Sequence, residues 1–114
     1  MKKYDLAIVG AGPAGMSAAL NARNDSLNFV LYESQEEGWF PRVSVDSHYR
    51  VDNYLGFNLI SGTDLILRFK DHLSSNGVSA KISKVVDIVK RNNEFEIFSS
   101  NDCVATDAVI LCTG

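Results

Sequence analysis

The sequence predicts an α/β fold with a central parallel sheet and an added antiparallel β-meander. Three observations support this prediction. A glycine-rich turn near the N-terminus joins an apolar run to a small-residue helical stretch, and a second apolar run then ends on an acidic residue. The C-terminal third alternates strand-like runs with turn-prone asparagines. Strands alternating with helices favour parallel pairing, whereas short strands joined by tight turns favour a meander.

The composition is that of an ordinary soluble domain. Of the 114 residues, 46% are hydrophobic and 22% are charged, so we expect residues 1–114 to form a single domain with a hydrophobic core. The net charge of −3, with no long basic run, argues against nucleic acid as a partner. No apolar stretch approaches the roughly 20 residues that a membrane span needs. Because Met1 to Tyr4 lead directly into the first strand and leave no room for a cleavable signal, we expect a cytoplasmic chain.

The first predicted strand, residues 4–9, runs into a G-x-G-x-x-G turn. Gly10 suits the tight turn off the strand, where a side chain would clash. Gly12 lacks a Cβ, so a pyrophosphate can approach the backbone closely, and Gly15 lets the following helix lie close to the sheet. The spacing of the three glycines is therefore typical of a dinucleotide-binding turn.

The first helix is expected to begin at about Pro13 and to continue through a small-residue stretch to Arg23. The fixed φ of proline suits the first helical position. The free N–H groups near Ala14 and the positive end of the helix dipole would hold a diphosphate without a lysine or an arginine.

The second predicted strand, residues 29–33, ends on Glu33, eighteen positions after Gly15. This is close to the spacing of an acid that accepts hydrogen bonds from ribose hydroxyls, and a carboxylate here disfavours a 2′-phosphate. This order of elements, a strand, a glycine turn, a helix and a second strand that ends on an acid, predicts a Rossmann-like dinucleotide site. The alternative interpretation is a glycine-rich turn that binds nothing.

Residues 34–60 are expected to form a long irregular stretch, and loops of this length in a compact domain are usually functional. Its aromatic residues are too apolar to lie free in water, so we expect them to pack on the sheet or on a flat aromatic cofactor. They are Trp39, Phe40, Tyr49, Tyr54 and Phe57. His48 lies in the same stretch and is assigned no chemistry.

A second helix is predicted to start after Ser61, its N-cap, with Asp64 three residues further on. The pattern stops at Asn76-Gly77, where a glycine can adopt the left-handed conformation. This helix is structural, and we expect His72 to be solvated. Its apolar face consists of Leu65, Ile66, Phe69 and Leu73.

The C-terminal third carries four strand signals, which predict the β-meander. They are Val78 to Ile82, Val85 to Val89, Phe95 to Phe98, and Val104. A last apolar run, Ala108 to Cys112, is predicted to return as a buried strand of the parallel core, beside residues 4–9 and 29–33.

Cys103 and Cys112 are too far apart for a C-x-x-C redox pair or a metal-ligand pair. We expect Cys112 to be a small buried apolar residue and Cys103 to lie at a strand edge.

Several blocks of the sequence resemble the FAD-binding domain of thioredoxin reductase and related flavoprotein reductases. These blocks are Ile8 to Gly15, Tyr32-Glu33, Val51 to Phe57, Ile60 to Leu65, and Ala108 to Gly114. The middle blocks are similar to the family pattern E-N-Y-P-G-F…I-S-G-x-E-L, which favours this branch over glutathione reductase or the amine oxidases.

The resemblance implies a role for each site residue. The glycine turn (Gly10, Gly12, Pro13, Ala14 and Gly15) would hold the FAD pyrophosphate. Glu33 and Ser34 would hold the AMP ribose, and a backbone group near Val85 would meet the adenine. Asn53 would bond the polar edge of the flavin, and Thr113-Gly114 would pass close to the cofactor. Such enzymes transfer a hydride from NADPH or NADH to the flavin, which passes electrons to an acceptor.

The chain also departs from the family pattern. It reads Gly38-Trp39-Phe40 where the family carries Gly-Gly-Gln or similar, and the C-x-x-C, the second G-x-G-x-x-G and the returning FAD segment do not occur in it. It therefore looks like the first segment of a discontinuous FAD-binding domain. We expect partial FAD binding without NADPH turnover, with a homodimer or the NADPH-domain segment as partner. The alternatives are a stand-alone module for NAD or ADP, or a fragment that binds nothing.

Overall fold

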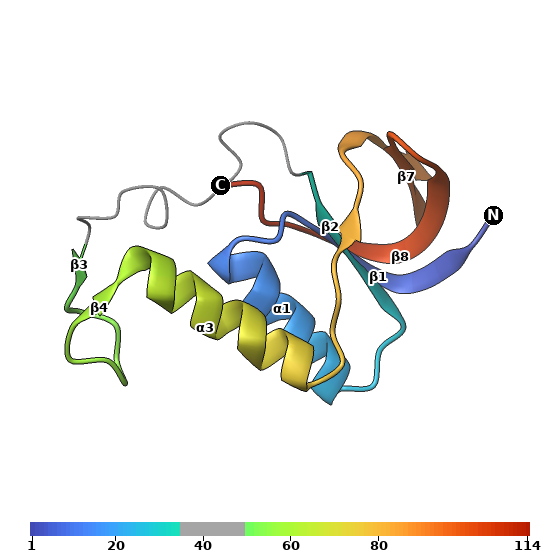
Figure 1. The fold of residues 1–114 in the computed structure, drawn as a ribbon. Helices are drawn as coiled ribbons and strands as arrows, with labels where there is room; N and C mark the ends of the chain where they lie inside the picture. The colour runs from blue at the N-terminus through green and yellow to red at the C-terminus, as the bar shows by residue number, and fades with distance from the viewer. Residues whose placement is uncertain (35–49) are drawn as a thin grey trace.

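The computed structural model describes residues 1–34 and 50–114 (Figure 1). Within these residues, six strands form one sheet in the order β5-β2-β1-β8-β7-β6. The strands are β1 (Lys3–Val9), β2 (Phe29–Glu33), β5 (Lys81–Ile82), β6 (Val85–Arg91), β7 (Glu94–Ser99) and β8 (Cys103–Leu111). The predicted α/β class, with a parallel core and an antiparallel meander, is confirmed.

Strand β1 lies at the centre of the parallel core, between β2 and β8. It pairs in parallel with β2 from Leu6↔Phe29 to Val9↔Tyr32, and in parallel with β8 from Lys3↔Ala105 to Val9↔Leu111. The meander adds antiparallel pairing of β6 with β7 and of β7 with β8. Its β6–β7 turn contains Asn92 at a φ of 54°, as the turn-prone asparagines predict.

Strand β8 is longer than predicted. The signals at Val104 and at Ala108–Cys112 belong to one continuous strand, Cys103–Leu111, and Cys112 lies just beyond it. No glycine or proline interrupts these residues, so the backbone stays extended. Residues 103–106 of β8 pair with β7 and residues 105–111 pair with β1, and one strand thereby joins the meander to the parallel core.

The prediction that the last apolar run is buried is wrong for most of its residues. Ile110 is 40% exposed, Leu111 is 67% exposed, and Ala108 is also exposed. Pairing between β7 and β8 ends at Phe95↔Thr106. Beyond that point β8 pairs with β1 alone among the described residues, which leaves one edge and part of one face open.

The segment Val78–Ile82 was predicted to be a strand of the meander, and this is wrong. Only Lys81–Ile82 forms a strand, β5, and it pairs in parallel with β2 on the other side of the sheet. The chain leaves the preceding helix through Gly77 at a φ of 73°, and Val78 is buried beneath the helices. Residues 78–80 are used to cross from the helix to the sheet, which shortens the strand.

Two helices, α1 (Pro13–Asn24) and α3 (Gly62–Ser75), pack together against one face of the sheet (Figure 1). The predicted N-cap is confirmed, because the N–H of Asp64 donates to Oγ of Ser61 over 3.1 Å. The predicted apolar face of α3 is also buried or half-buried, and His72 is exposed. A short hairpin of β3 (Arg50–Val51) and β4 (Ile60–Ser61), which the sequence did not predict, precedes α3.

The opposite face of the sheet is covered by the meander. A second apolar cluster lies there and includes Tyr4, Val9, Tyr32, Ile97 and Val104. The fold therefore has a layer of helices on one side and a curled antiparallel layer on the other. Across residues 1–34 and 50–114, the structure contains no helix with the length and apolarity of a membrane span.

Candidate functional site

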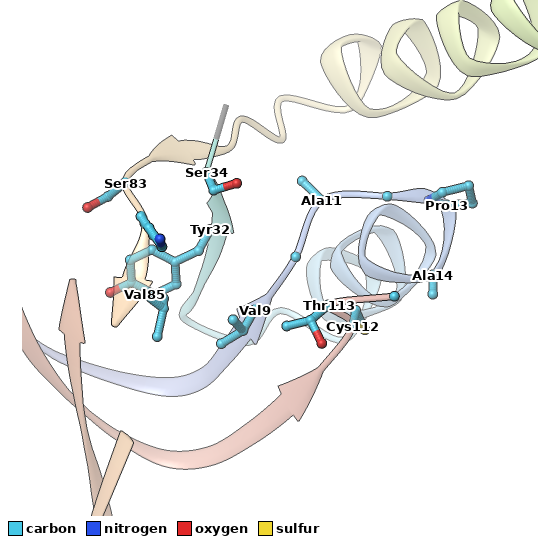
Figure 2. A pocket seen from close by; sticks show the side chains of 14 residues that line it. Val9, Ala11, Pro13, Ala14, Tyr32, Ser34, Ser83, Val85, Cys112 and Thr113 are labelled. Atoms are coloured by element: carbon cyan, nitrogen blue, oxygen red, sulfur yellow. The ribbon is translucent and has the colours of Figure 1, made fainter. Parts of the chain in front are cut away.

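A cavity of about 440 Å³ opens at the carboxyl ends of β1, β2 and β8, where the strand order reverses (Figure 2). In open α/β sheets this reversal point is the usual place for a ligand. We call it the glycine-turn cavity. Its lining residues are Val9, Gly10, Ala11, Gly12, Pro13, Ala14, Tyr32, Ser34, Ser83, Lys84, Val85, Cys112, Thr113 and Gly114.

The glycine turn is held tightly against the segment that follows β8. Gly10 has a φ of 109°, and a Cβ at this position would lie 2.1 Å from the carbonyl oxygen of Cys112. The N–H of Cys112 donates to the carbonyl oxygen of Val9 over 2.7 Å, which keeps the two segments adjacent. Only glycine satisfies both the left-handed backbone and the close approach.

Gly15 has a different role from the other two glycines. It is buried and does not line the cavity, and a Cβ on it would lie 1.7 Å from the carbonyl oxygen of Gly10. The first turn of α1 therefore rests directly on the glycine turn. This close packing aims the start of the helix at the cavity.

Gly12 faces open space, since no heavy atom lies within 4 Å of a Cβ built there. It is the N-cap of α1, and its carbonyl oxygen accepts a hydrogen bond from Met16 over 2.9 Å. No side chain caps this helix end. An uncapped N-terminus of a 12-residue helix, opening into a cavity beside a residue without a side chain, suits a diphosphate.

The end of β2 meets the cavity through Tyr32 and Ser34, while Glu33 between them does not line it. Glu33 is 9% exposed, and its carbonyl oxygen accepts a hydrogen bond from the N–H of Ser83 over 2.9 Å. The ribose role of Glu33 therefore stays a prediction. The predicted contribution of Ser34 to the cavity fits its position.

Tyr32 was not predicted as a site residue. Its side chain is 1% exposed, and its hydroxyl has no hydrogen-bond partner among the described residues. Burial, with a smaller contribution from the nearby Asp102 carboxylate, raises the pKa of the phenol above its ordinary value. The ring thus acts as a neutral, largely apolar wall. The alternation of β2 could have identified it, because it points to the opposite side from Glu33.

The wall beside Tyr32 is formed by Ser83, Lys84 and Val85, the connection between β5 and β6 (Figure 2). The resemblance implies that a backbone group near Val85 meets the adenine; Val85 lines the cavity, and the adenine contact stays a prediction. Ser83 and Lys84 were missed, because the sequence does not show that β5 pairs with β2 and brings this connection to the cavity.

The C-terminal segment contributes Thr113 and Gly114, as the resemblance implies, together with Cys112. Cys112 is half-buried rather than fully buried, because the cavity exposes one side of it. Both cysteines are free thiols. Within the described residues, no group of three or more histidine, cysteine or acidic side chains could hold a metal ion.

Asn53 lies apart from the glycine-turn cavity, in a separate shallow pocket formed by residues 52–58. Its neighbour Tyr54 packs on Phe69 of α3, with ring centroids 5.4 Å apart, and on Phe57 at 6.3 Å. Tyr54 therefore packs on a helix rather than on the sheet, and Phe57 packs against Tyr54. The predictions for Gly38, Trp39, Phe40, His48 and Tyr49 concern residues outside those that the structure describes.

Comparison with known proteins places the chain in a family. Residues 4–114 match the family model of pyridine nucleotide-disulphide oxidoreductases. The chain is 33% identical over 111 residues to thioredoxin reductase of Ureaplasma parvum, covering 97% of this chain and 35% of that protein. It is 35% identical to a 34.2 kDa protein in the rubredoxin operon of Clostridium pasteurianum, covering 99% of this chain and 36% of that protein.

Solved structures agree with the sequence comparison. A ferredoxin-flavin thioredoxin reductase from Clostridium acetobutylicum superimposes with a TM-score of 0.86 at 32% identity, over 97% of this chain and 37% of that one. The thioredoxin reductase of T. acidophilum gives a TM-score of 0.79 at 32% identity, over 100% and 36% of the two chains. The chain thus spans a little over a third of the length of these relatives. It belongs to the pyridine nucleotide-disulphide oxidoreductase family and is thioredoxin reductase-like.

Proposed function

We propose that the chain binds FAD through the glycine-turn cavity, as the FAD-binding part of a thioredoxin reductase-like flavoprotein oxidoreductase. Such a protein passes electrons from NAD(P)H through FAD to a disulfide or another acceptor. The observation that carries the proposal is the uncapped start of α1, which opens into the cavity at Gly12 with no atom in the way. The family match and the reversal of strand order at this point support it.

The residues divide into a diphosphate end, an adenosine end and a flavin end. Gly10, Gly12, Pro13 and Ala14 would hold the diphosphate, with Gly15 fixing the helix behind them. Glu33, Ser34 and the backbone at Val85 would hold the adenosine. Thr113 lies on the side of the cavity opposite Ser83 (Figure 2). With the adjoining Gly114 and with Asn53, it would face the flavin.

The size of the cavity fits the nucleotide half of the cofactor better than the whole. Ligand sites commonly enclose about 300–1,000 Å³, and 440 Å³ lies near the lower end of that range. When bound, the flavin supplies the two-electron chemistry, while the residues of this chain bind and orient it. The chain contains no C-x-x-C motif and only one G-x-G-x-x-G, so we expect no NADPH turnover from residues 1–114 alone. A homodimer or a companion NADPH-domain segment would supply the remaining parts.

The test is a calorimetric titration of ADP and FAD into the chain and into two matched variants. Gly12→Asp and Gly12→Asn differ only in charge, and both residues favour an N-cap, so neither should destabilise α1. At φ −76° and ψ −171° the backbone accepts either side chain. The carboxylate should abolish binding of both ligands by repulsion, while the amide should weaken it less. Equal affinity of the two variants for ADP would contradict a diphosphate site at this helix end.

A second candidate function is a stand-alone module that binds NAD or ADP without redox chemistry. It is favoured by the same observation, because the diphosphate end and the adenosine end do not depend on a flavin. The two functions differ in what FAD adds over ADP. If FAD binds more tightly than ADP and its absorbance bands shift on binding, the flavoprotein function is supported. If NAD, ADP and FAD bind alike and the flavin spectrum is unchanged, the module without redox chemistry is supported.

A further inference from the structure

The adenosine wall, Ser83 to Val85, is the connection between β5 and β6. It leaves β5 after two residues and enters β6, whose register with β7 shifts between Val85 and Asp87. Such a shift bends the strand locally. The N–H of Ser83 ties this wall to Glu33, and a second part of the chain holds it as well.

That part is the turn between β7 and β8, residues 99–102. Oγ of Ser100 accepts a hydrogen bond from the N–H of Lys84 and lies 3.2 Å from Oγ of Ser83, which is 4% exposed. The N–H of Ser100 donates to the carbonyl oxygen of Lys84 over 2.8 Å. Ser100 therefore contacts two consecutive residues of the cavity wall, Ser83 through its hydroxyl and Lys84 through both its hydroxyl and its N–H.

Contacts on the β5 side secure the same wall. Nδ2 of Asn101 donates to the carbonyl oxygen of Ile82 over 3.2 Å. The ammonium of Lys81 forms an ion pair with the carboxylate of Asp102 and lies 5.8 Å from the centre of the Tyr32 ring. The turn is also braced internally, since Oγ of Ser99 donates to Oδ1 of Asp102 over 2.8 Å.

We propose that the β7–β8 turn sets the shape of the adenosine end of the glycine-turn cavity, with Ser100 as a positioning residue for the nucleobase. This inference rests on the proposed function and deepens it, because it names the feature that makes the site prefer a purine. Ser100 and Asn101 do not line the cavity, so they act only through Ile82, Ser83 and Lys84. A well-placed wall favours the larger adenine ring over a pyrimidine, whereas the diphosphate end does not distinguish the two.

The experiment compares the affinities of ADP and UDP for the chain and for Ser100→Ala. Both nucleotides share the ribose and the diphosphate. The ratio of their affinities therefore reports on the contact of the nucleobase with the adenosine wall. Loss of the hydroxyl removes the bond to Lys84 and the contact with Ser83, and we expect the ADP-to-UDP ratio to fall by about fivefold. Ser100→Thr, which keeps the hydroxyl at an exposed position, should restore the ratio. Ser75→Ala, at the exposed end of α3, is the control and should leave it unchanged.

A measurement without nucleotide tests the geometry separately. Hydrogen exchange at the N–H of Lys84 should accelerate in Ser100→Ala and not in Ser75→Ala. An unchanged exchange rate together with an unchanged ratio would overturn the inference. So would an equal loss of ADP and UDP affinity with a lower melting temperature, since that indicates a purely structural serine. If the unmodified chain binds neither nucleotide, the proposed function itself fails, and the inference fails with it.

Discussion

The carbonyl oxygen of Gly10 lies 1.7 Å from the position that a Cβ on Gly15 would occupy. The first turn of α1 and the glycine turn are therefore in direct backbone contact. Since neither side of this contact is a flexible side chain, a methyl group can be accommodated only by moving the helix away from the sheet. The same movement would displace the start of α1 from the cavity.

Gly15→Ala should consequently destabilise the chain strongly, by at least about 3 kcal/mol, because the clash is with backbone. Gly12→Ala is the matched control, since its new methyl group meets no atom within 4 Å. Urea unfolding followed by circular dichroism gives the free energy of unfolding of both. Similar stabilities of the two variants would contradict the packing described for Gly15.

Ser61→Ala should reduce the free energy of unfolding by about 1 kcal/mol, because it removes the acceptor for the N–H of Asp64. Ser61→Asp should retain the cap and much of the stability, since an aspartate also accepts from the first turn. Thermal unfolding of the two variants beside the parent chain measures the difference. A Ser61→Ala variant as stable as the parent chain would show that the cap contributes little.

The ion pair of Asp102 with Lys81 makes stability depend on pH. The hydrogen bond from Lys81, followed by that from Ser99, lowers the pKa of Asp102 below its ordinary value. A lowered folded-state pKa contributes stability that is present above the unfolded pKa, near pH 4, and is lost as the pH falls through the folded value. Both side chains are about a third exposed, so screening limits the effect to roughly 0.5 kcal/mol.

Asp102→Asn should remove this part of the pH dependence. Urea unfolding at a series of pH values between neutral and acid measures it. The difference in stability between the parent and the variant should shrink as the pH falls below about 4. A difference that stays constant over this range would exclude a contribution from the Asp102 charge.

The open part of β8 should promote self-association. Leu111 is 67% exposed beside an edge that has β1 as its sole partner among the described residues. Unpaired edges with apolar side chains associate, and a lysine blocks this. Leu111→Lys should therefore lower the fraction of dimers or larger species in sedimentation, whereas Leu27→Lys, at a 41% exposed site away from the edge, should not. Equal effects of the two variants would point to net charge as the cause.

The sequence predicted those features that depend on neighbours along the chain. The glycine turn, the cap at Ser61 and the stop at Gly77 are local, since each requires a particular residue type within one turn of backbone. The parallel core followed from the apolar runs. Of the predicted site residues, those that line the cavity are Gly10, Gly12, Pro13, Ala14, Ser34, Val85, Thr113 and Gly114.

The features that were missed depend on contacts between distant residues. That β5 pairs with β2 decides the place of Ser83 and Lys84, and no local pattern records this pairing. The exposure of Ile110 and Leu111 depends on where β7 ends relative to β8, which is a matter of register. The alternation of β2 indicates the side of the sheet on which Tyr32 lies, but it does not reveal that Lys81 of β5 and Asp102 of the β7–β8 turn lie near its ring.

The double pairing of β8 also bears on how the chain is made. Val9 lies opposite Leu111 in the central ladder, although about a hundred residues separate them in the sequence. A ribosome delivers the N-terminal strand first, and its second partner emerges only after nearly all of residues 1–111 have been synthesised. The β1-α1-β2 unit is complete by residue 33, but the other edge of β1 stays unpaired until β8 has been made, and pairings of such long range form slowly. A chaperone that shields the open edge of β1 during this delay would raise the yield of folded protein.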